Sequence, residues 1–339
     1  MIEIDGSYME GGGQILRTSI TLSAITGRPC KIYNIRKGRP KPGLQPQHLK
    51  VVEAAAKMTN AKVSGLEIGS EVIEFSPSEI RSGVFNIDTG TAGSVTLIMQ
   101  ALMPICLFAK KQSTLNVSGG TDVPWSPSIH YFKNVFLSTL EAVGMKSGEA
   151  YDLTIDKYGF YPKGGGSIRL RVRPFSAFKK FCLNSRGNIR KFDMISMASD
   201  DLRASHVAER QINGAEFLLG KLGKREVLYP RTLSPGSSFI AVACFEKSRI
   251  GVSVLGKQYK KAEIVGREAA KELVAQTESH ACLDEHMADQ ILIYMALAKD
   301  AAVSVSKISN HTRTNMWVIE KFLPVKFAVR GNVITVSSC

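Results

Sequence analysis

The sequence lacks several patterns that identify common protein classes. Its six cysteines are scattered and form no Cys-x-x-Cys pair, so neither a zinc knuckle nor a thioredoxin-type redox motif is indicated. It contains no Gly-Lys-Ser or Gly-Lys-Thr sequence, which argues against a Walker-type NTPase. The longest apolar run, residues 94–109, is too short to span a bilayer, and the first residues lack the apolar stretch of a signal peptide. We therefore expect a cytoplasmic protein with no membrane partner.

Acidic residues are also in short supply. The chain has 44 Lys and Arg against 30 Asp and Glu, a formal net charge of +14. Such an excess favours a polyanionic partner, a nucleic acid or a nucleotide, over an acidic protein surface. The length of 339 residues is enough for two or three domains.

One order of elements recurs with a period of about 80 residues. Apolar patterning predicts β-α-β-α-β-β in three units, about residues 1–80, 81–175, and 176–183 continued by 280–339. We predict an α/β (α+β) fold in which the helices of each unit pack on a four-stranded sheet. Residues 1–183 and 280–339 would form a large domain, and residues 184–279 a small inserted α/β domain.

Two stretches near the N-terminus suit a phosphate group. Glu10 to Gln14 contains three consecutive glycines immediately before an apolar helix, and a helix start supplies free N–H groups and partial positive charge. The following loop sets basic side chains among prolines and glycines, namely Arg36, Lys37, Arg39 and Lys41. A solvated turn is the alternative for either stretch alone, but together they favour an anion site.

A second candidate site lies near the C-terminus. His311 comes just before a helix expected to start near Thr314, with Thr312 or Thr314 as its cap. A helix N-terminus disfavours a protonated imidazole and welcomes phosphate, so this histidine could attack a phosphoryl group. On this segment alone, a polar capping histidine is the simpler interpretation.

Other polar residues lie at predicted helix starts or within helices. Asp289 is expected in the first turn of an apolar helix, at the position that Glu10 holds in the first unit, and the two acids could hold a divalent cation. Gln100 lies among apolar neighbours and needs a hydrogen-bond partner. We expect Trp125 to pack within its loop, with stacking on a nucleic-acid base as the alternative.

Taken together, these motifs resemble the RNA 3′-terminal phosphate cyclase family over essentially the whole chain. The motifs that carry the resemblance are Glu10 to Gln14 with Arg17, the loop from Arg36 to Gln47, Gly90 to Ser94, Gly119 to Val123, Tyr161 to Gly166, Ala288 to Gln290, and His311 to Asn315. The resemblance implies three βαβαββ units with an inserted α/β domain, in agreement with the element pattern.

The resemblance also implies an ATP-dependent enzyme that converts an RNA 3′-terminal phosphate to a 2′,3′-cyclic phosphodiester. His311 would form a covalent bond to AMP, and the AMP would pass to the RNA phosphate before the 2′-hydroxyl closes the ring. By the same resemblance, Glu10 would contact a divalent metal, Mg or Mn. The phosphate of the RNA end would be held by Arg17, Arg36, Arg39 and Gln47. The adenylate site would comprise Gln100, Pro127, His286, Asp289 and Gln290.

Three alternatives stay open from the sequence. One is a cyclase-like RNA-binding protein of ribosome biogenesis that keeps the scaffold without catalysis, although His311, Arg36 and Arg39 favour the active branch. The others are a carboxyvinyl-transferase enzyme, also built from repeated α/β units, and a plain RNA-binding module. The sequence leaves the oligomeric state open, a homodimer included.

Overall fold

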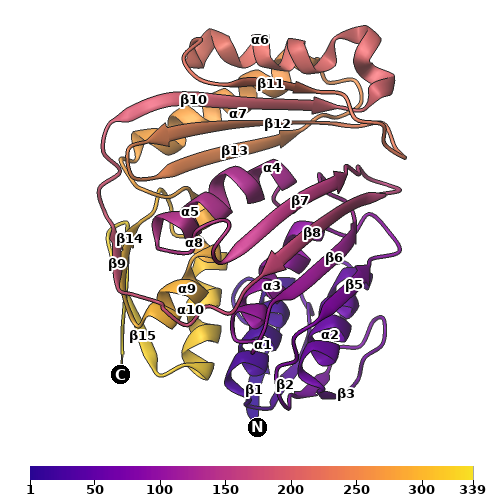
Figure 1. The fold of residues 1–339 in the computed structure, drawn as a ribbon, viewed down its shortest axis with the longest axis vertical. Coiled ribbons are helices and arrows are strands. Elements are labelled where there is room, and N and C mark those ends of the chain that lie inside the picture. Colours follow the sequence, from indigo (N-terminus) through magenta and orange to yellow (C-terminus); the bar gives the residue numbers. More distant parts are fainter. Residues whose placement is uncertain (339) are drawn as a thin grey trace.

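The computed structural model of the protein describes residues 1–338, which form four four-stranded sheets covered by helices (Figure 1). Both chain ends lie at one end of the long axis, and the segment containing β10–β13 lies at the other. The mixed α/β class predicted from the sequence is confirmed.

The first two units follow the predicted element order. Unit one consists of β1 (Ile2–Asp5), α1 (Gly13–Thr26), β2 (Cys30–Tyr33), α2 (Pro46–Thr59), β3 (Lys62–Ser64) and β4 (Ile73–Ser76). Unit two consists of β5 (Val84–Asp88), α3 (Val95–Leu107), β6 (Ser113–Gly119), the segment α4 (Ile129–Tyr131), η1 (Phe132–Leu137) and α5 (Ser138–Ala142), then β7 (Tyr151–Lys157) and β8 (Gly166–Val172).

The third unit is split along the chain, as predicted. It consists of β9 (Phe181–Leu183), α8 (Glu285–Gln290), α9 (Leu292–Ala298), β14 (Asp300–Ser304), α10 (Asn310–Phe322), β15 (Val325–Arg330) and β16 (Val333–Ser338). The sequence pattern predicts one helix over residues 284–298, and this prediction is wrong, because the helix breaks at Ile291 into α8 and α9.

All three units share one sheet topology. In each, the first strand pairs in parallel with the second, the second pairs antiparallel with the fourth, and the third strand lies at the edge beside the fourth. The two helices follow the first and second strands. The parallel pair therefore requires a helical crossover in each unit, which places a helix N-terminus beside the end of each first strand.

The second helix of unit two is irregular. The sequence predicts one helix over residues 127–143, but the middle turn, η1, is a wider π-helical turn. Tyr131 and Val135 face the sheet of the inserted segment, whereas Phe132 and Phe136 face the central core. The segment from α4 to α5 thus packs against the inserted segment on one side and against the central core on the other.

Residues 184–279 fold around their own sheet. Their elements are β10 (Ile189–Ala198), η2 (Asp200–Ser205), α6 (Val207–Leu219), β11 (Arg225–Leu228), β12 (Ser237–Phe245), β13 (Arg249–Leu255) and α7 (Ala262–Glu278). β11 pairs in parallel with β10 and was not predicted from the sequence. Every residue of β12 is buried, because α6 and α7 cover one face of the sheet and the η1 segment contacts the other. The boundaries of an inserted domain at residues 184 and 279 stay a prediction.

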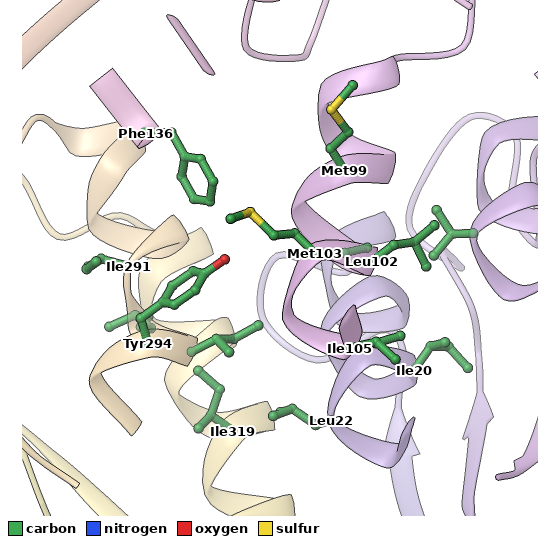
Figure 2. Close-up of a cluster of buried hydrophobic side chains, with 14 of the residues drawn as sticks. Ile20, Leu22, Met99, Leu102, Met103, Ile105, Phe136, Ile291, Tyr294 and Ile319 are labelled. Carbon is green, nitrogen blue, oxygen red and sulfur yellow. The ribbon is translucent and has the colours of Figure 1, made fainter. Parts of the chain in front are cut away.

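The helices of all three units share one hydrophobic core. Figure 2 shows Met103 of α3 pointing toward Phe136 and Tyr294, while Ile20 of α1 lies beside Ile105 of α3 and Leu22 of α1 lies near Ile319 of the third unit. Burial of this common surface holds the N-termini of helices from different units close together. Among residues 1–338, no helix has the length and apolar character needed to cross a membrane.

The shared core makes a direct stability prediction. Leu102 is fully buried, so Leu102→Ala should lower the free energy of unfolding by about 2–5 kcal/mol. Urea denaturation followed by circular dichroism measures the change. The matched control Leu222→Ala removes a leucine that is 68% exposed and should change stability by no more than about 0.5 kcal/mol. Equal effects of the two substitutions would contradict this core assignment.

Candidate active site

The three-glycine turn brings the chain close to two polar side chains. Gly11 has φ 60°, in the left-handed region, and α1 begins at Gly13 with Gly12 as its N-cap. A Cβ at Gly12 would collide with the Glu10 carboxylate, and one at Gly13 would collide with the ring of His48. A side chain at either position would therefore displace Glu10 or His48 from its place beside the start of α1.

His311 lies in the first helical turn of α10, next to the three-glycine segment. The helix starts earlier than predicted, and Ser309 caps it by accepting from the Thr312 backbone N–H, so the expected caps are wrong. The capping role is thus filled by Ser309, and the imidazole is free for other contacts. Its Nδ1 lies 3.0 Å from Gln14 Oε1, and its Nε2 lies 3.5 Å from Glu10 Oε1.

The amide of Gln14 selects the tautomer of His311. Gln14 Nε2 donates a hydrogen bond to the carboxylate of Asp289, so the amide oxygen faces His311. An amide oxygen can only accept, so Nδ1 of His311 must carry the proton. The lone pair is then on Nε2, which leaves Nε2 as the nucleophilic atom.

Two pKa shifts support this arrangement at neutral pH. Burial raises the pKa of the Asp289 carboxyl to about 6, against the opposing influence of His286 and Arg17. Asp289 is therefore ionised at pH 7 and accepts from Gln14. Burial and the neighbouring cations Arg39 and Arg17 lower the pKa of His311 from 6.5, so its imidazole is neutral and able to attack.

Asn315 connects the elements that carry these groups. Its side-chain nitrogen donates to the backbone oxygen of Asp289 at 2.8 Å, and its oxygen accepts from the Thr18 hydroxyl at 2.7 Å. Asp289 lies near the end of α8 and not in a first helical turn as predicted. The amide of Asn315 therefore ties α8 to α1 through α10.

Cationic side chains surround the start of α1. Arg39 forms an ion pair with Glu10, whose side chain is 8% exposed. The pKa of Arg17 is lowered to about 10 by burial, with Asp289 acting in the opposite direction. Arg36 donates to the Gly43 backbone oxygen at 3.0 Å and so closes its own loop. Burial, Arg17 and Arg36 lower the pKa of His48 to about 3, so the imidazole beneath Gly13 stays neutral.

The residues predicted for an adenylate site come from facing elements of units two and three. Gln100 donates to the side-chain oxygen of Gln290 at 2.7 Å, which supplies the partner that the sequence analysis required. Pro127 accepts from the Thr96 hydroxyl at 2.8 Å through its backbone oxygen. The ring of His286 lies edge-on to Tyr131 with centroids 6.5 Å apart.

Gln47, another predicted phosphate ligand, contacts the start of α3. Its side-chain oxygen accepts from the Ser94 backbone N–H at 3.3 Å, and its side chain lines a hollow beside Trp125. It is nevertheless adjacent to His48, which packs against Gly13. Gln47 therefore lies one residue away from the arginine and glycine cluster.

The structure offers one carboxylate at the predicted metal position. Both oxygens of Glu10 are buried without a hydrogen-bond donor, and their charge is met by Arg39. A single carboxylate that acts with nucleotide phosphates fits the way Mg²⁺ binds in many phosphoryl-transfer sites. The Asp289 carboxylate, the other predicted metal ligand, instead accepts a hydrogen bond from Gln14. Within residues 1–338, the one group of three potential ligands is Glu272, Glu285 and His286, and it includes neither of the two acids.

Three residues in this cluster had no role assigned from the sequence, namely Gln14, His48 and Asn315. Gln14 lies within the motif from Glu10 to Gln14 and Asn315 within the motif from His311 to Asn315, so their positions in the sequence were a signal for both. Their partners lie far away in the chain, 275 residues for the Gln14 contact with Asp289. The role of His48 depends on its contact with Gly13 and has no sequence pattern.

Comparison with known proteins identifies the family. The family model for RNA 3′-terminal phosphate cyclase matches residues 8–329. The chain is 45% identical over 338 residues to a protein of that name from Pyrococcus furiosus, with 98% of this chain and 96% of the relative covered. It is 44% identical to the proteins of that name from Methanopyrus kandleri, with 98% and 96% covered, and Pyrobaculum aerophilum, with 96% and 94% covered. The chain therefore belongs to the RNA 3′-terminal phosphate cyclase family.

Proposed function

We propose that this protein is an enzyme that converts an RNA 3′-terminal phosphate to a 2′,3′-cyclic phosphodiester at the expense of ATP. The observation that carries the proposal is the contact between Gln14 and His311, which leaves the lone pair on Nε2 beside Glu10 and a cationic cluster. Family membership supports the substrate class, because the relatives are named for this reaction. A cytoplasmic location and the oligomeric state stay predictions.

In the first step, Nε2 of His311 attacks the α-phosphorus of ATP and pyrophosphate leaves. The ring becomes positively charged as the N–P bond forms, and its Nδ1–H donates to Gln14 Oε1. That hydrogen bond becomes charge-assisted, so it strengthens as the bond to phosphorus forms. Arg39 and Arg17, which face the imidazole, would counter the charge on the phosphates.

In the second step, an oxygen of the RNA 3′-phosphate attacks the adenylate phosphorus and the N–P bond breaks. His311 departs as a neutral imidazole. In the third step, the 2′-hydroxyl loses its proton and attacks the 3′-phosphorus, and AMP leaves. This last step is intramolecular and needs a ribose 2′-hydroxyl, which restricts the reaction to RNA ends.

A divalent cation would be held by Glu10 together with nucleotide phosphates, and it would neutralise phosphate charge. Arg17 and Arg36, which both lie near His48, would hold the terminal phosphate of the RNA. Gln100, Pro127, His286 and Gln290 would surround the adenylate. Gln290 and Gln100 can orient a base edge by hydrogen bonding because their amides are already fixed against each other.

His311→Ala should abolish transfer of label from α-labelled ATP to the protein, because the nucleophile is removed. Denaturing electrophoresis with divalent metal present measures the covalent label. The matched control is His206→Ala, which removes an exposed histidine of the inserted segment and should retain labelling. Label retained by the His311→Ala protein would place the nucleophile elsewhere.

The rate of self-adenylation should fall as the pH drops through about 6, because Asp289 then takes up a proton and no longer fixes the Gln14 amide. Asp289→Asn should slow labelling by about 10–100-fold at pH 7. It should also remove the part of the pH profile that Asp289 causes. A pH profile that is unchanged in Asp289→Asn would contradict the positioning role of this carboxylate.

Arg36→Ala should spare self-adenylation and raise the KM for an RNA 3′-phosphate by roughly tenfold or more, since a charge-assisted contact to phosphate is lost. Steady-state cyclisation kinetics and ATP labelling, measured in parallel, test this. The neighbouring exposed Lys37→Ala provides the control for a general loss of positive charge. Equal loss of both steps would count against a phosphate-binding role for Arg36.

A further inference from the structure

Two aromatic side chains project into solvent beside the candidate active site. Trp125 is 98% exposed and Tyr161 is 66% exposed. Both line a hollow of about 200 Å³ together with Gln47. The expectation that Trp125 packs within its loop is therefore wrong. Large aromatic side chains that a fold leaves in water mark a surface that contacts another molecule.

The loop holds Trp125 in this exposed position. Its backbone has φ 60°, a left-handed conformation that is sparsely populated by residues other than glycine. The flanks are anchored, because Val123 is buried and Ser128 is buried as the cap of α4. Ser126 also donates to the Val123 backbone oxygen at 3.0 Å. Exposure of the indole is thus imposed by a fixed loop.

The hollow connects to the catalytic histidine through a short series of contacts. Gln47 lines the hollow and is adjacent to His48 in α2. His48 packs against Gly13, and Gln14 holds the imidazole of His311. A strand whose terminal phosphate lies between Arg36 and His311 would therefore pass Gln47 and reach the two aromatic rings.

Positive charge lies along the same surface. A second cavity, of about 470 Å³, is lined by Gly90 and Thr91 of the loop whose Ala92 lines the hollow, and by Lys157 and Lys163. Two carboxylates also line it, but Asp156 pairs with Arg169 at 3.6 Å and Asp88 accepts from the Gly90 backbone N–H at 2.9 Å. Both lysines are exposed, and within residues 1–338 neither forms an ion pair with a carboxylate.

We propose that Trp125 and Tyr161 stack the bases of the nucleotides that precede the RNA 3′ end, and that Lys157 and Lys163 contact the backbone of that strand. The proposal rests on the proposed function, because it assumes that the terminal phosphate is held by Arg36. Aromatic faces beside lysines are the combination that binds single-stranded nucleic acid without sequence preference. The net charge of +14 favours this polyanionic partner over a protein surface.

The test compares two ligands that share a terminal 3′-phosphate, a short single-stranded oligoribonucleotide and a nucleoside 3′-phosphate. Only the oligonucleotide has bases that can reach Trp125. Trp125→Ala should raise the ratio of the oligonucleotide Kd to the mononucleotide Kd by roughly tenfold, and Tyr161→Ala should act in the same direction. Fluorescence anisotropy and competition without ATP measure both constants, and Trp125→Phe should restore most of the ratio.

An abasic oligonucleotide and a distant variant supply the controls. Abasic sites upstream of the terminal nucleotide should weaken binding to the natural chain and should remove the effect of Trp125→Ala, because the stacked partner is then missing. Phe217→Ala removes a phenylalanine that is 85% exposed on α6, at the far end of the molecule in Figure 1, and should leave the ratio unchanged.

The outcomes separate this inference from the proposed function. An unchanged ratio in Trp125→Ala, with cyclisation intact in the natural chain, would overturn the stacking role alone. A change from dimer to monomer in Trp125→Ala, with no change in the ratio, would overturn it in favour of contact with a second copy. If the natural chain neither takes label from ATP nor cyclises RNA, yet the ratio still depends on Trp125, the proposed function fails and the stacking site stands.

Discussion

One glutamine amide connects two titratable side chains at the candidate active site, and the arrangement of that site depends on it. Gln14 donates to Asp289 and accepts from His311, so its orientation fixes which imidazole nitrogen carries the proton. Gln14 belongs to α1 of the first unit, whereas its two partners belong to α8 and α10 of the third. A change in the packing between these units would therefore alter the contacts of His311 directly, even without a change in any residue of the site.

The threefold repetition of one βαβαββ unit explains why such a site can form. Each unit places helix N-termini beside its first strand, and the shared apolar core in Figure 2 brings the helices of the three units together. Polar contacts then join the units at their helix ends, as in the hydrogen bond between Gln100 and Gln290. The apolar core supplies the cohesion, and the few polar contacts set the relative positions.

The repeated architecture could be predicted because it depends on local apolar patterning that recurs three times. The features that the sequence did not reveal depend on contacts between distant segments. The break at Ile291 comes where polar Asp289 and Gln290 give way to an apolar run. β11 has only four residues, two charged followed by two apolar, and so shows no strand-like alternation. The role of Gln14 depends on Asp289, and the exposure of Trp125 depends on a left-handed backbone that no local pattern indicates.

The placement of the inserted segment has a consequence for biosynthesis. β9 cannot form its parallel pair with β14 until β14 has been translated, because all of residues 184–279 lie between the two strands. Units one and two consist of consecutive residues and can acquire their sheets while the ribosome is still elongating the chain. His311 and Asn315 lie close to the end of translation. A nascent chain therefore carries the glycine turn and its arginines long before it carries His311, and a chain truncated before α10 would lack the contact between Gln14 and His311.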